Sequence, residues 1–305
     1  MIKEELKLLL EKQGYGFIGK HSAIKICEWT KKSLRDEGVC YKEKFYGIKA
    51  HRCCQMSPSI GFCQNRCIFC WRPIEYTIGT KIKGKVDNPK ELIENAIKMQ
   101  QKQLIGFKGY KKVNIKKLEE AMKPNQFAIS LSGEPCIYPK LGQLIKEIHK
   151  RKATSFLVTN GLQPEVLEKL KPLPTNLYIS LDAPNEELFK KVDKSTIKNA
   201  WKKLNRSLKI MSKLKTRTVM RITAIKNINM VEPENYAKLI QKAKPDFVEV
   251  KSYMWVGSSR ERLEIDSMPY HEDIQAFAKE IVNFLPDYKI KDEKKESRVV
   301  LLSKK

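Results

Sequence analysis

The 305-residue sequence lacks long apolar runs, and it contains only four histidines. No stretch of eighteen apolar residues occurs, so no membrane span is predicted. The first ten residues mix charged residues with leucine and lack the apolar core of a secretory signal. We therefore expect a cytoplasmic protein in a reducing compartment, where eight cysteines indicate metal binding rather than disulfides.

Acidic residues are also few: 35 Asp and Glu stand against 60 Lys and Arg, which gives a formal net charge of +25. An excess of this size favours a polyanionic partner, with nucleic acid first and anionic lipid second. A lysine-rich proteome would produce the same balance without any such partner. Charge alone therefore does not identify what the protein binds.

Three cysteines lie close together, at Cys63, Cys67 and Cys70, in the spacing C-x3-C-x2-C. Three thiolates on one short loop can bind three irons of a 4Fe–4S cluster and leave the fourth iron open to a small molecule. Zinc is the alternative, but it usually takes four N or S ligands in two separated pairs, and His149 and His271 lie far away in sequence. The loop resembles that of the radical S-adenosyl-L-methionine (SAM) family. The resemblance implies that the open iron binds SAM and that the reduced cluster cleaves it to a 5′-deoxyadenosyl radical.

A second set of cysteines precedes this loop, with twelve residues between successive members: Cys27, Cys40 and Cys53. Equal long spacings differ from the close pairs of a zinc ribbon, and single buried cysteines are common in proteins. Residues 40–58, together with the loop ending Cys70-Trp71-Arg72, nevertheless resemble the tricyclic-wyosine tRNA-modifying radical SAM enzymes. This resemblance continues to about Lys251 and so covers most of the chain.

The resemblance implies a second 4Fe–4S cluster on Cys27, Cys40 and Cys53, again with one open iron. Cys54 is a competing ligand because it directly follows Cys53. Cys53 is preferred because its spacing and the preceding His51-Arg52 match the family at that position. Adjacent residues of a strand point to opposite faces, so only one of the two should reach the cluster.

Short apolar runs and helical patterns alternate along the rest of the chain. Strands are predicted at 52–56, 127–131, 155–159, 177–181, 219–224 and 247–250, with a further candidate at 299–302. Helices are predicted within residues 1–20, near 88–97 and 141–148, as one lysine-rich helix over 186–213, and near 236–240 and 274–284. Such repeats imply a parallel sheet with right-handed crossovers. We predict an α/β fold, a partial (β/α)6 TIM-like radical SAM barrel open on one side.

A single radical SAM domain is predicted over residues 1–305. It divides into an N-terminal extension over 1–50 that carries second-cluster ligands, the barrel over 51–285, and a charged tail over 286–305, of which we expect residues 289–305 to fray. Function should then lie at the carboxyl ends of the barrel strands.

Polar residues follow the predicted strands at those ends. The resemblance implies that Gly133 and Glu134 hold the SAM amino group. Asn and Asp side chains in Thr159-Asn160 and Ser180-Leu-Asp182 can hydrogen-bond a ribose or a carboxylate, and Arg221 and Lys251 are cations suited to the SAM carboxylate. Taken singly, each motif could equally be an ordinary turn or an ion-paired strand residue.

Aromatic and cationic residues alternate in three segments, at 71–72, 107–112 and 253–260. An enzyme that modifies an RNA base must hold that base unstacked, which aromatic and cationic side chains can do. The alternative is that Trp71 and Trp255 only cover the barrel.

The resemblance implies a lyase that condenses 1-methylguanosine, next to the anticodon of phenylalanine tRNA, with pyruvate to give 4-demethylwyosine. The radical would abstract hydrogen from the N1-methyl group, the carbon radical would attack the pyruvate carbonyl carbon, and the carboxyl carbon would leave. Lys42 would hold pyruvate as a Schiff base, with Lys44 the nearest competitor if the segment is extended.

Some relatives carry an N-terminal flavodoxin-like domain. Since none is recognised in this sequence, electrons are expected from a separate flavodoxin- or ferredoxin-like donor. Two other functions remain open: another radical SAM RNA-modifying enzyme, such as a methylthiotransferase, or a non-catalytic metal-stapled RNA-binding module.

Overall fold

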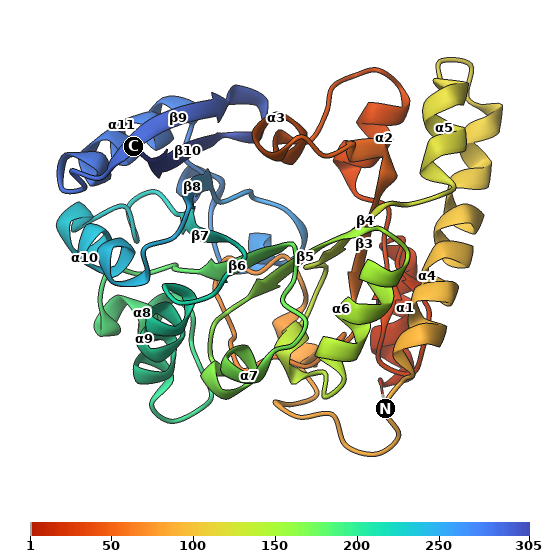
Figure 1. Cartoon of the computed structure of the whole chain (residues 1–305), viewed down its shortest axis with the longest axis horizontal. Helices are drawn as coiled ribbons and strands as arrows, with labels where there is room; N and C mark the ends of the chain where they lie inside the picture. The colour runs from red at the N-terminus through yellow and green to blue at the C-terminus, as the bar shows by residue number, and fades with distance from the viewer. Residues whose placement is uncertain (1) are drawn as a thin grey trace. The chain divides into compact units, whose positions relative to one another are not determined.

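The computed structural model describes residues 2–305, which form two compact units (Figure 1). The first unit contains residues 2–63, Ile78–Val158 and Leu170–Thr175. The second contains Gln64–Thr77, Thr159–Lys169 and Asn176–Lys305. Met1, with which the predicted segment 1–20 and the predicted domain begin, lies outside the described residues.

The first unit contains five strands, in the sheet order β1 (Gly16–Phe17), β2 (Ala23–Ile24), β3 (Cys53–Ser57), β4 (Gln126–Ile129) and β5 (Thr154–Thr159). The first two pairings are antiparallel, whereas β3–β4 and β4–β5 are parallel. The helices are α1 (Glu4–Lys12), α2 (Glu28–Leu34), α3 (Tyr41–Tyr46), α4 (Pro89–Leu104), α5 (Ile115–Ala121) and α6 (Leu141–Lys150), with 3-10 turns η1 (Ala50–Arg52), η3 (Ile105–Gly109) and η4 (Pro135–Ile137). Helices α4 and α5 lie beside each other in Figure 1.

Helix α4 shows how local signals set these elements. Asn88 is its N-cap, and its side chain accepts a hydrogen bond from the Lys90 amide at 2.9 Å. Pro89 follows at the first helical position, where its missing N–H costs nothing. The buried face of the helix, which includes Leu92 and Ile93, contacts β2 and β3. The helix predicted to begin at this point is therefore confirmed.

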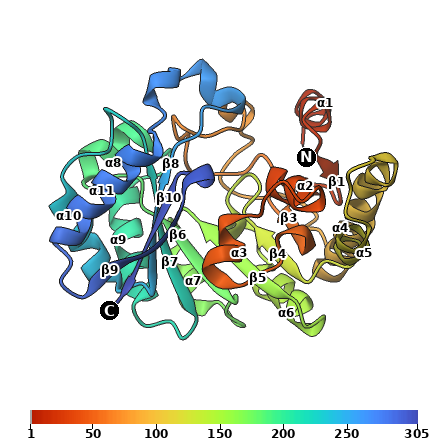
Figure 2. The same ribbon diagram turned by 90° about the horizontal axis from the view of Figure 1, so that it is seen from above.

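The second unit contains five strands, in the sheet order β6 (Asn176–Ser180), β7 (Arg217–Ala224), β8 (Phe247–Ser252), β10 (Val299–Lys304) and β9 (Tyr288–Lys294). Strands β6, β7 and β8 are parallel, and β10 is antiparallel to both β8 and β9. The helices are α7 (Pro164–Lys169), α8 (Glu186–Val192), α9 (Ala200–Met211), α10 (Pro233–Ala243) and α11 (His271–Asn283), with turns η2 (Ile74–Tyr76), η5 (Gly257–Glu261), η6 (Ile265–Ser267) and η7 (Lys295–Ser297). Helix α10 contacts both α9 and α11 and lies between them in Figure 1, and Figure 2 shows the three helices from above.

The predicted lysine-rich helix over 186–213 is wrong, because this stretch forms two helices, α8 and α9. Between them, Lys194 and Asn199 have φ values of 43° and 58°. A right-handed helix cannot continue through such residues. The connecting segment is therefore free to make contacts of its own, and the Thr196 amide donates to the Gln64 carbonyl at 2.8 Å.

The prediction that residues 289–305 fray is also wrong. Strands β9 and β10 form an antiparallel pair that extends the sheet from β8. The cause is the apolar run at 299–302, every residue of which is fully buried. The strand predicted there is confirmed. Among residues 2–305, no helix is both long and apolar enough to span a bilayer.

Candidate functional site

Cys27, Cys40 and Cys53 come together in the first unit. Burial, followed by the nearby charge of Cys27, raises the pKa of the Cys53 thiol to about 12; Lys42 opposes this shift and Cys40 adds to it. These electrostatic effects place Cys27, Cys40 and the Lys42 ammonium near the Cys53 thiol. Cys27 and Cys40 are the N-cap residues of α2 and α3, and Cys53 begins β3. The position of each cysteine is thus set by the start of a helix or strand.

Cys54 does not belong to this group. It is fully buried on the opposite face of β3, and burial, followed by the charge of Cys53, raises the pKa of its thiol. The six predicted ligands are all partly exposed, whereas the two remaining cysteines, Cys54 and Cys136, are buried. The preference for Cys53 over Cys54 thus agrees with where the two side chains lie.

The donor set suits an iron–sulfur cluster in its chemistry, since thiolates are the ligands such clusters take. Within residues 2–305, no three His, Cys, Asp or Glu side chains lie close enough together to hold a single metal ion. A 4Fe–4S cluster binds each thiolate through a different iron, so its ligands need not converge on one point.

Lys42 lies in the first turn of α3, and its Nζ is 5.1 Å from the centroid of the Phe156 ring. Lys44 would share the face of Lys42 only in an extended segment. The segment is helical, so the two side chains lie on different faces. Two residues along a helix correspond to a rotation of about 200°. Lys44 is exposed, whereas Lys42 is half-buried.

One face of the first unit's sheet lies beneath these groups. Cys53 pairs with Gln126, which pairs with Thr154, so the three side chains form one row across β3, β4 and β5. Gln126 donates a hydrogen bond to Cys53 Sγ at 3.9 Å and accepts one from Thr154 Oγ1 at 3.2 Å. Phe156, under Lys42, belongs to the next row. None of these neighbours was predicted from the sequence.

The two cysteine sets are connected by β3. Cys53 begins this strand, and the segment leading to Cys63 follows its end at Ser57. At a rise of about 3.3 Å per residue, the strand spans about 13 Å from Cys53 to Ser57. Lys42 lies over Phe156, which is in the second row of side chains on this face if the row of Cys53 is counted as the first.

Gly133 and Glu134 hold the segment that leads into the cluster loop. The Glu134 amide donates to the Phe62 carbonyl at 2.8 Å, and Ser59 Oγ donates to the Glu134 carbonyl at 2.8 Å. The buried Glu134 carboxylate accepts a hydrogen bond from the Cys136 amide at 2.9 Å. Gly133 has a φ of +74°, and a Cβ at this position would lie 2.1 Å from the Ser59 carbonyl oxygen. These two backbones can approach so closely only at a glycine.

Gly133→Ala should lower the free energy of unfolding of the reconstituted protein by about 2–5 kcal/mol, because a left-handed alanine and overlap with a backbone oxygen both add cost. Denaturant unfolding measures the change. The matched control is Gly106→Ala, since no heavy atom lies within 4 Å of a Cβ there. Equal stability of the two variants would contradict the close approach at Gly133.

In the second unit, Asp193 contacts the cluster loop. Cys67 Sγ donates to Asp193 Oδ1 at 3.3 Å, and Asn65 Nδ2 donates to the same oxygen at 3.0 Å. Asp193 is buried, and burial, followed by the charge of Asp182, raises the pKa of its carboxyl. Arg262 fastens the other part of the loop by donating to the carbonyls of Ile68 and Cys70. No sequence motif marks Asp193 or Arg262.

Two residues predicted to face RNA make contacts within the protein. Arg72 is buried and donates to Thr77 Oγ1 at 2.7 Å and to the Asn65 carbonyl at 3.0 Å, so it stabilises the loop. Trp255 donates its indole N–H to the Leu263 carbonyl at 2.7 Å and packs on an apolar cluster. The alternative that Trp255 acts as a cover therefore agrees with its contacts. The Trp71 carbonyl accepts from the Ser258 amide at 3.0 Å.

Three predicted residues of the second unit, Ser180, Arg221 and Lys251, lie in two neighbouring rows on one sheet face. Ser180 pairs with Arg221, which pairs with Glu249, and the next row contains Thr223 and Lys251. Asp182, just beyond β6, accepts a hydrogen bond from the Thr223 amide at 3.0 Å, and its burial raises the pKa of its carboxyl. The rows thus bring Ser180, Asp182, Arg221 and Lys251 together at the carboxyl ends of β6, β7 and β8.

Several of these side chains already have protein partners. Arg221 forms a 2.8 Å ion pair with the fully buried Glu249, and Lys251 donates to the Ser297 carbonyl at 3.0 Å. Thr159 Oγ1 accepts from the Gly161 amide at 3.1 Å, and Asn160 Nδ2 donates to Gln64 at 3.2 Å. The alternative interpretations from sequence therefore hold in part: Arg221 is an ion-paired strand residue, and Thr159 accepts a hydrogen bond within a turn.

Comparisons with known proteins agree with this geometry. A family model described as "Radical SAM superfamily" matches residues 57–240, and one described as "Wyosine base formation" matches residues 242–304. The chain is 51% identical, over 98% of its length and 88% of the relative's, to the "S-adenosyl-L-methionine-dependent tRNA 4-demethylwyosine synthase" of Pyrococcus abyssi. It is 40% identical to the mouse protein described as "S-adenosyl-L-methionine-dependent tRNA 4-demethylwyosine synthase TYW1", and the match covers 100% of this chain and 42% of that longer protein.

A solved structure described as "Structure of TYW1 with a lysine-pyruvate adduct bound" is similar throughout. The two chains are 38% identical, the TM-score is 0.90, and the match covers 100% of this chain and 97% of the other. Since both identity and coverage are high, the chain belongs to the S-adenosyl-L-methionine-dependent tRNA 4-demethylwyosine synthase family, within the radical SAM superfamily.

Proposed function

We propose that this chain is a cytoplasmic radical SAM lyase that condenses 1-methylguanosine, beside the anticodon of phenylalanine tRNA, with pyruvate to form 4-demethylwyosine. The observation that carries the proposal is the position of Lys42 next to Cys27, Cys40 and Cys53. The relative with a lysine–pyruvate adduct supports it. The proposed architecture is one catalytic domain, a partial (β/α)6 barrel with an N-terminal extension.

Two 4Fe–4S clusters are proposed, one on Cys63, Cys67 and Cys70 and one on the second cysteine set. When bound, the first supplies the electron that cleaves SAM and so generates the radical. Asp193, which accepts hydrogen bonds from the Asn65 side chain and the Arg66 amide, and Arg262 keep the loop around Cys67 and Cys70 in place. The second set lies beside the proposed pyruvate site, where an open iron could take the pyruvate carboxylate.

Lys42 is proposed to bind pyruvate covalently. Its Nζ attacks the ketone carbon, the carbonyl oxygen leaves as water, and the resulting imine fixes the substrate on α3. The half-buried position of Lys42 over Phe156 limits solvent access and holds the side chain in one direction. A positively charged imine would also lie beside the thiolates of the second set, whose charges act on this neighbourhood.

The SAM molecule is proposed to bind along the segments that follow the strands, with contributions from Gly133, Glu134, Thr159, Asn160, Ser180, Asp182, Arg221 and Lys251. The close approach of Gly133 to the Ser59 carbonyl brings Glu134 to the start of the cluster loop. Asp182 and Arg221 supply buried or half-buried polar groups at strand ends. An external flavodoxin- or ferredoxin-like protein is proposed as the electron donor.

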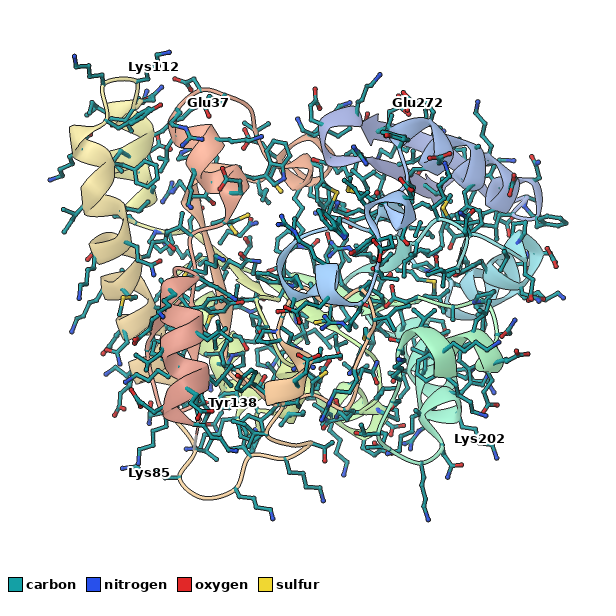
Figure 3. The ribbon with its side chains drawn as sticks, turned by 180° about the vertical axis from the view of Figure 1, so that it is seen from behind. Glu37, Lys85, Lys112, Tyr138, Lys202 and Glu272 are labelled. Carbon is teal, nitrogen blue, oxygen red and sulfur yellow. The ribbon has the colours of Figure 1, made fainter. Side chains whose placement is uncertain are left out.

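The proposed tRNA surface includes residues 107–112. Phe107 packs against buried apolar side chains. Tyr110 is exposed, and its ring centroid lies 5.8 Å from the Cζ atom of the Arg35 guanidinium. Lys111 and Lys112 are both exposed, and Lys112 is labelled in Figure 3. This combination of aromatic and cationic side chains suits single-stranded RNA.

tRNA affinity should fall steeply with salt, since each neutralised phosphate releases counterions. Lys111→Gln/Lys112→Gln should flatten the slope by up to about two units, one for each phosphate that the variant no longer neutralises. The control Lys209→Gln/Lys213→Gln removes the same charge from exposed positions of α9 and the turn after it. Binding measured at several salt concentrations tests this, and a slope near zero would mean that the +25 charge is only background composition.

Anaerobic incubation with SAM, pyruvate, a reductant and tRNA carrying 1-methylguanosine tests the proposed activity. Nucleoside mass spectrometry should show 1-methylguanosine converted to 4-demethylwyosine. A methylthio-modified nucleoside would instead indicate a methylthiotransferase. A colourless zinc protein that binds tRNA but does not cleave SAM would indicate a metal-stapled RNA-binding module.

A further inference from the structure

A cationic cavity in the second unit is lined by residues that belong to neither cysteine set and to none of the proposed SAM contacts. It has a volume of about 470 Å³ and lies where α8 ends and α9 begins. Its lining includes Phe189, Lys190, Ser195, Lys198, Trp201 and Lys202. The volume falls in the range of about 300–1,000 Å³ that is usual for small-ligand sites.

The side chains of this cavity combine positive charge with an aromatic ring. Lys190 is ion-paired with Glu186 at 3.0 Å, whereas Lys198 and Lys202 make no ion pair within residues 2–305. Both lysines are exposed, and Lys202 is labelled on the surface in Figure 3. Trp201 is half-buried and packs against Phe189 with ring centroids 5.5 Å apart.

Two residues in the cavity wall also have side chains that lack an expected hydrogen bond. Ser195 Oγ is buried and has no hydrogen-bond partner in the described part of the chain. Asn199, the N-cap residue of α9, has a left-handed backbone and makes no capping hydrogen bond with its side chain. The Asn199 side chain therefore does not cap the first backbone N–H groups of this twelve-residue helix. Uncapped N–H groups at a helix N-terminus can bind an anion.

The wall of the cavity is part of the segment that holds the cluster loop. The Arg66 amide donates to the Asp193 carbonyl at 2.9 Å, and the Thr196 amide donates to the Gln64 carbonyl at 2.8 Å. Ser195 lies between these two anchors. Its Cα is within about 7 Å of that of Asp193, since two residues span no more than this. Asp193 in turn accepts a hydrogen bond from the side chain of Asn65, two residues before Cys67.

We propose that this cavity binds one nucleotide of the tRNA substrate, with a phosphate between Lys198 and Lys202 and a base against Trp201. The proposal rests on the proposed tRNA-modifying function and adds a site for the RNA. Two ammonium groups, free hydrogen-bonding groups and an aromatic surface are the features that bind single-stranded RNA. RNA held here would contact the segment that anchors the loop of Cys67.

The first test compares two pairs of substitutions in the reconstituted enzyme. Lys198→Gln/Lys202→Gln should raise the tRNA dissociation constant about tenfold and reduce the salt slope by about one. The matched pair Lys209→Gln/Lys213→Gln removes the same charge away from the cavity and should change the dissociation constant by less than about threefold. Equal effects of the two pairs would overturn the proposal, even if the wild type makes product normally.

A second measurement does not depend on any variant. Ultraviolet cross-linking of tRNA to the wild-type enzyme, followed by peptide mass spectrometry, should find a nucleotide on the peptide that contains Trp201. AMP is the probe for a free nucleotide as the alternative ligand. Cross-links confined to other peptides, or AMP binding that needs Lys198 and Lys202 while tRNA binding does not, would overturn the proposal. If the wild type failed to bind tRNA at all, the proposed function itself would fail.

Discussion

Lys42→Ala is expected to lower formation of the tricyclic base by at least about a thousandfold, because loss of a covalent nucleophile removes the reaction path that depends on it. The two clusters and the cleavage of SAM should remain, since Lys42 is not among the proposed cluster ligands. Product is measured as 4-demethylwyosine by nucleoside mass spectrometry. Iron content and the yield of 5′-deoxyadenosine are measured in the same samples.

The matched control for this experiment is Lys44→Ala. Lys44 lies on the same short helix but is exposed, and the helical rotation directs it away from the face of Lys42. The control should retain turnover within a fewfold of the wild type. Full turnover by the Lys42 variant, or loss of turnover in the Lys44 variant alone, would remove Lys42 from the mechanism.

The second large effect concerns the two cysteine sets. Each 4Fe–4S cluster holds four irons, so the reconstituted wild type should contain about eight irons per chain. Alanine at Cys63, Cys67 or Cys70 should abolish reductive cleavage of SAM. Alanine at a member of the second set, for example Cys53, should leave about four irons and some SAM cleavage that is not coupled to product.

Cys54→Ala is the control for the second set. Cys54 adjoins Cys53 in sequence but is buried on the other face of β3, so its replacement should leave the iron content unchanged. If Cys54→Ala lost iron as Cys53→Ala does, the ligand assignment would be wrong. The same conclusion would follow if variants of both sets lost SAM cleavage equally.

Most of the strands could be predicted from sequence because each is a short apolar run next to a helix or a turn. Strand β9 was missed because most of its residues are charged and only Tyr288 is buried, whereas its pairing with the buried β10 orders it. The break between α8 and α9 was missed because the lysine-rich pattern continues through Lys194 and Asn199, whose backbone is left-handed.

The cysteines and Lys42 could be selected from sequence through the family resemblance, but their supporting contacts could not. Asp193 lies 126 residues from Cys67, and Arg262 lies 192 residues from Cys70. Such contacts depend on tertiary packing, and no local sequence pattern predicts them. For the same reason, the burial of Arg72 and the ion pair of Arg221 with Glu249 became evident only in the fold.

Trapping the substrate on the protein tests the central claim most directly. The reconstituted enzyme is incubated with pyruvate, reduced with borohydride and digested, and the peptides are analysed by mass spectrometry. The account predicts a pyruvate-derived mass on the peptide that contains Lys42, fragmentation that assigns it to this residue, and no such mass without pyruvate. An adduct on Lys44 instead, or no adduct in an enzyme that still forms 4-demethylwyosine, would contradict it.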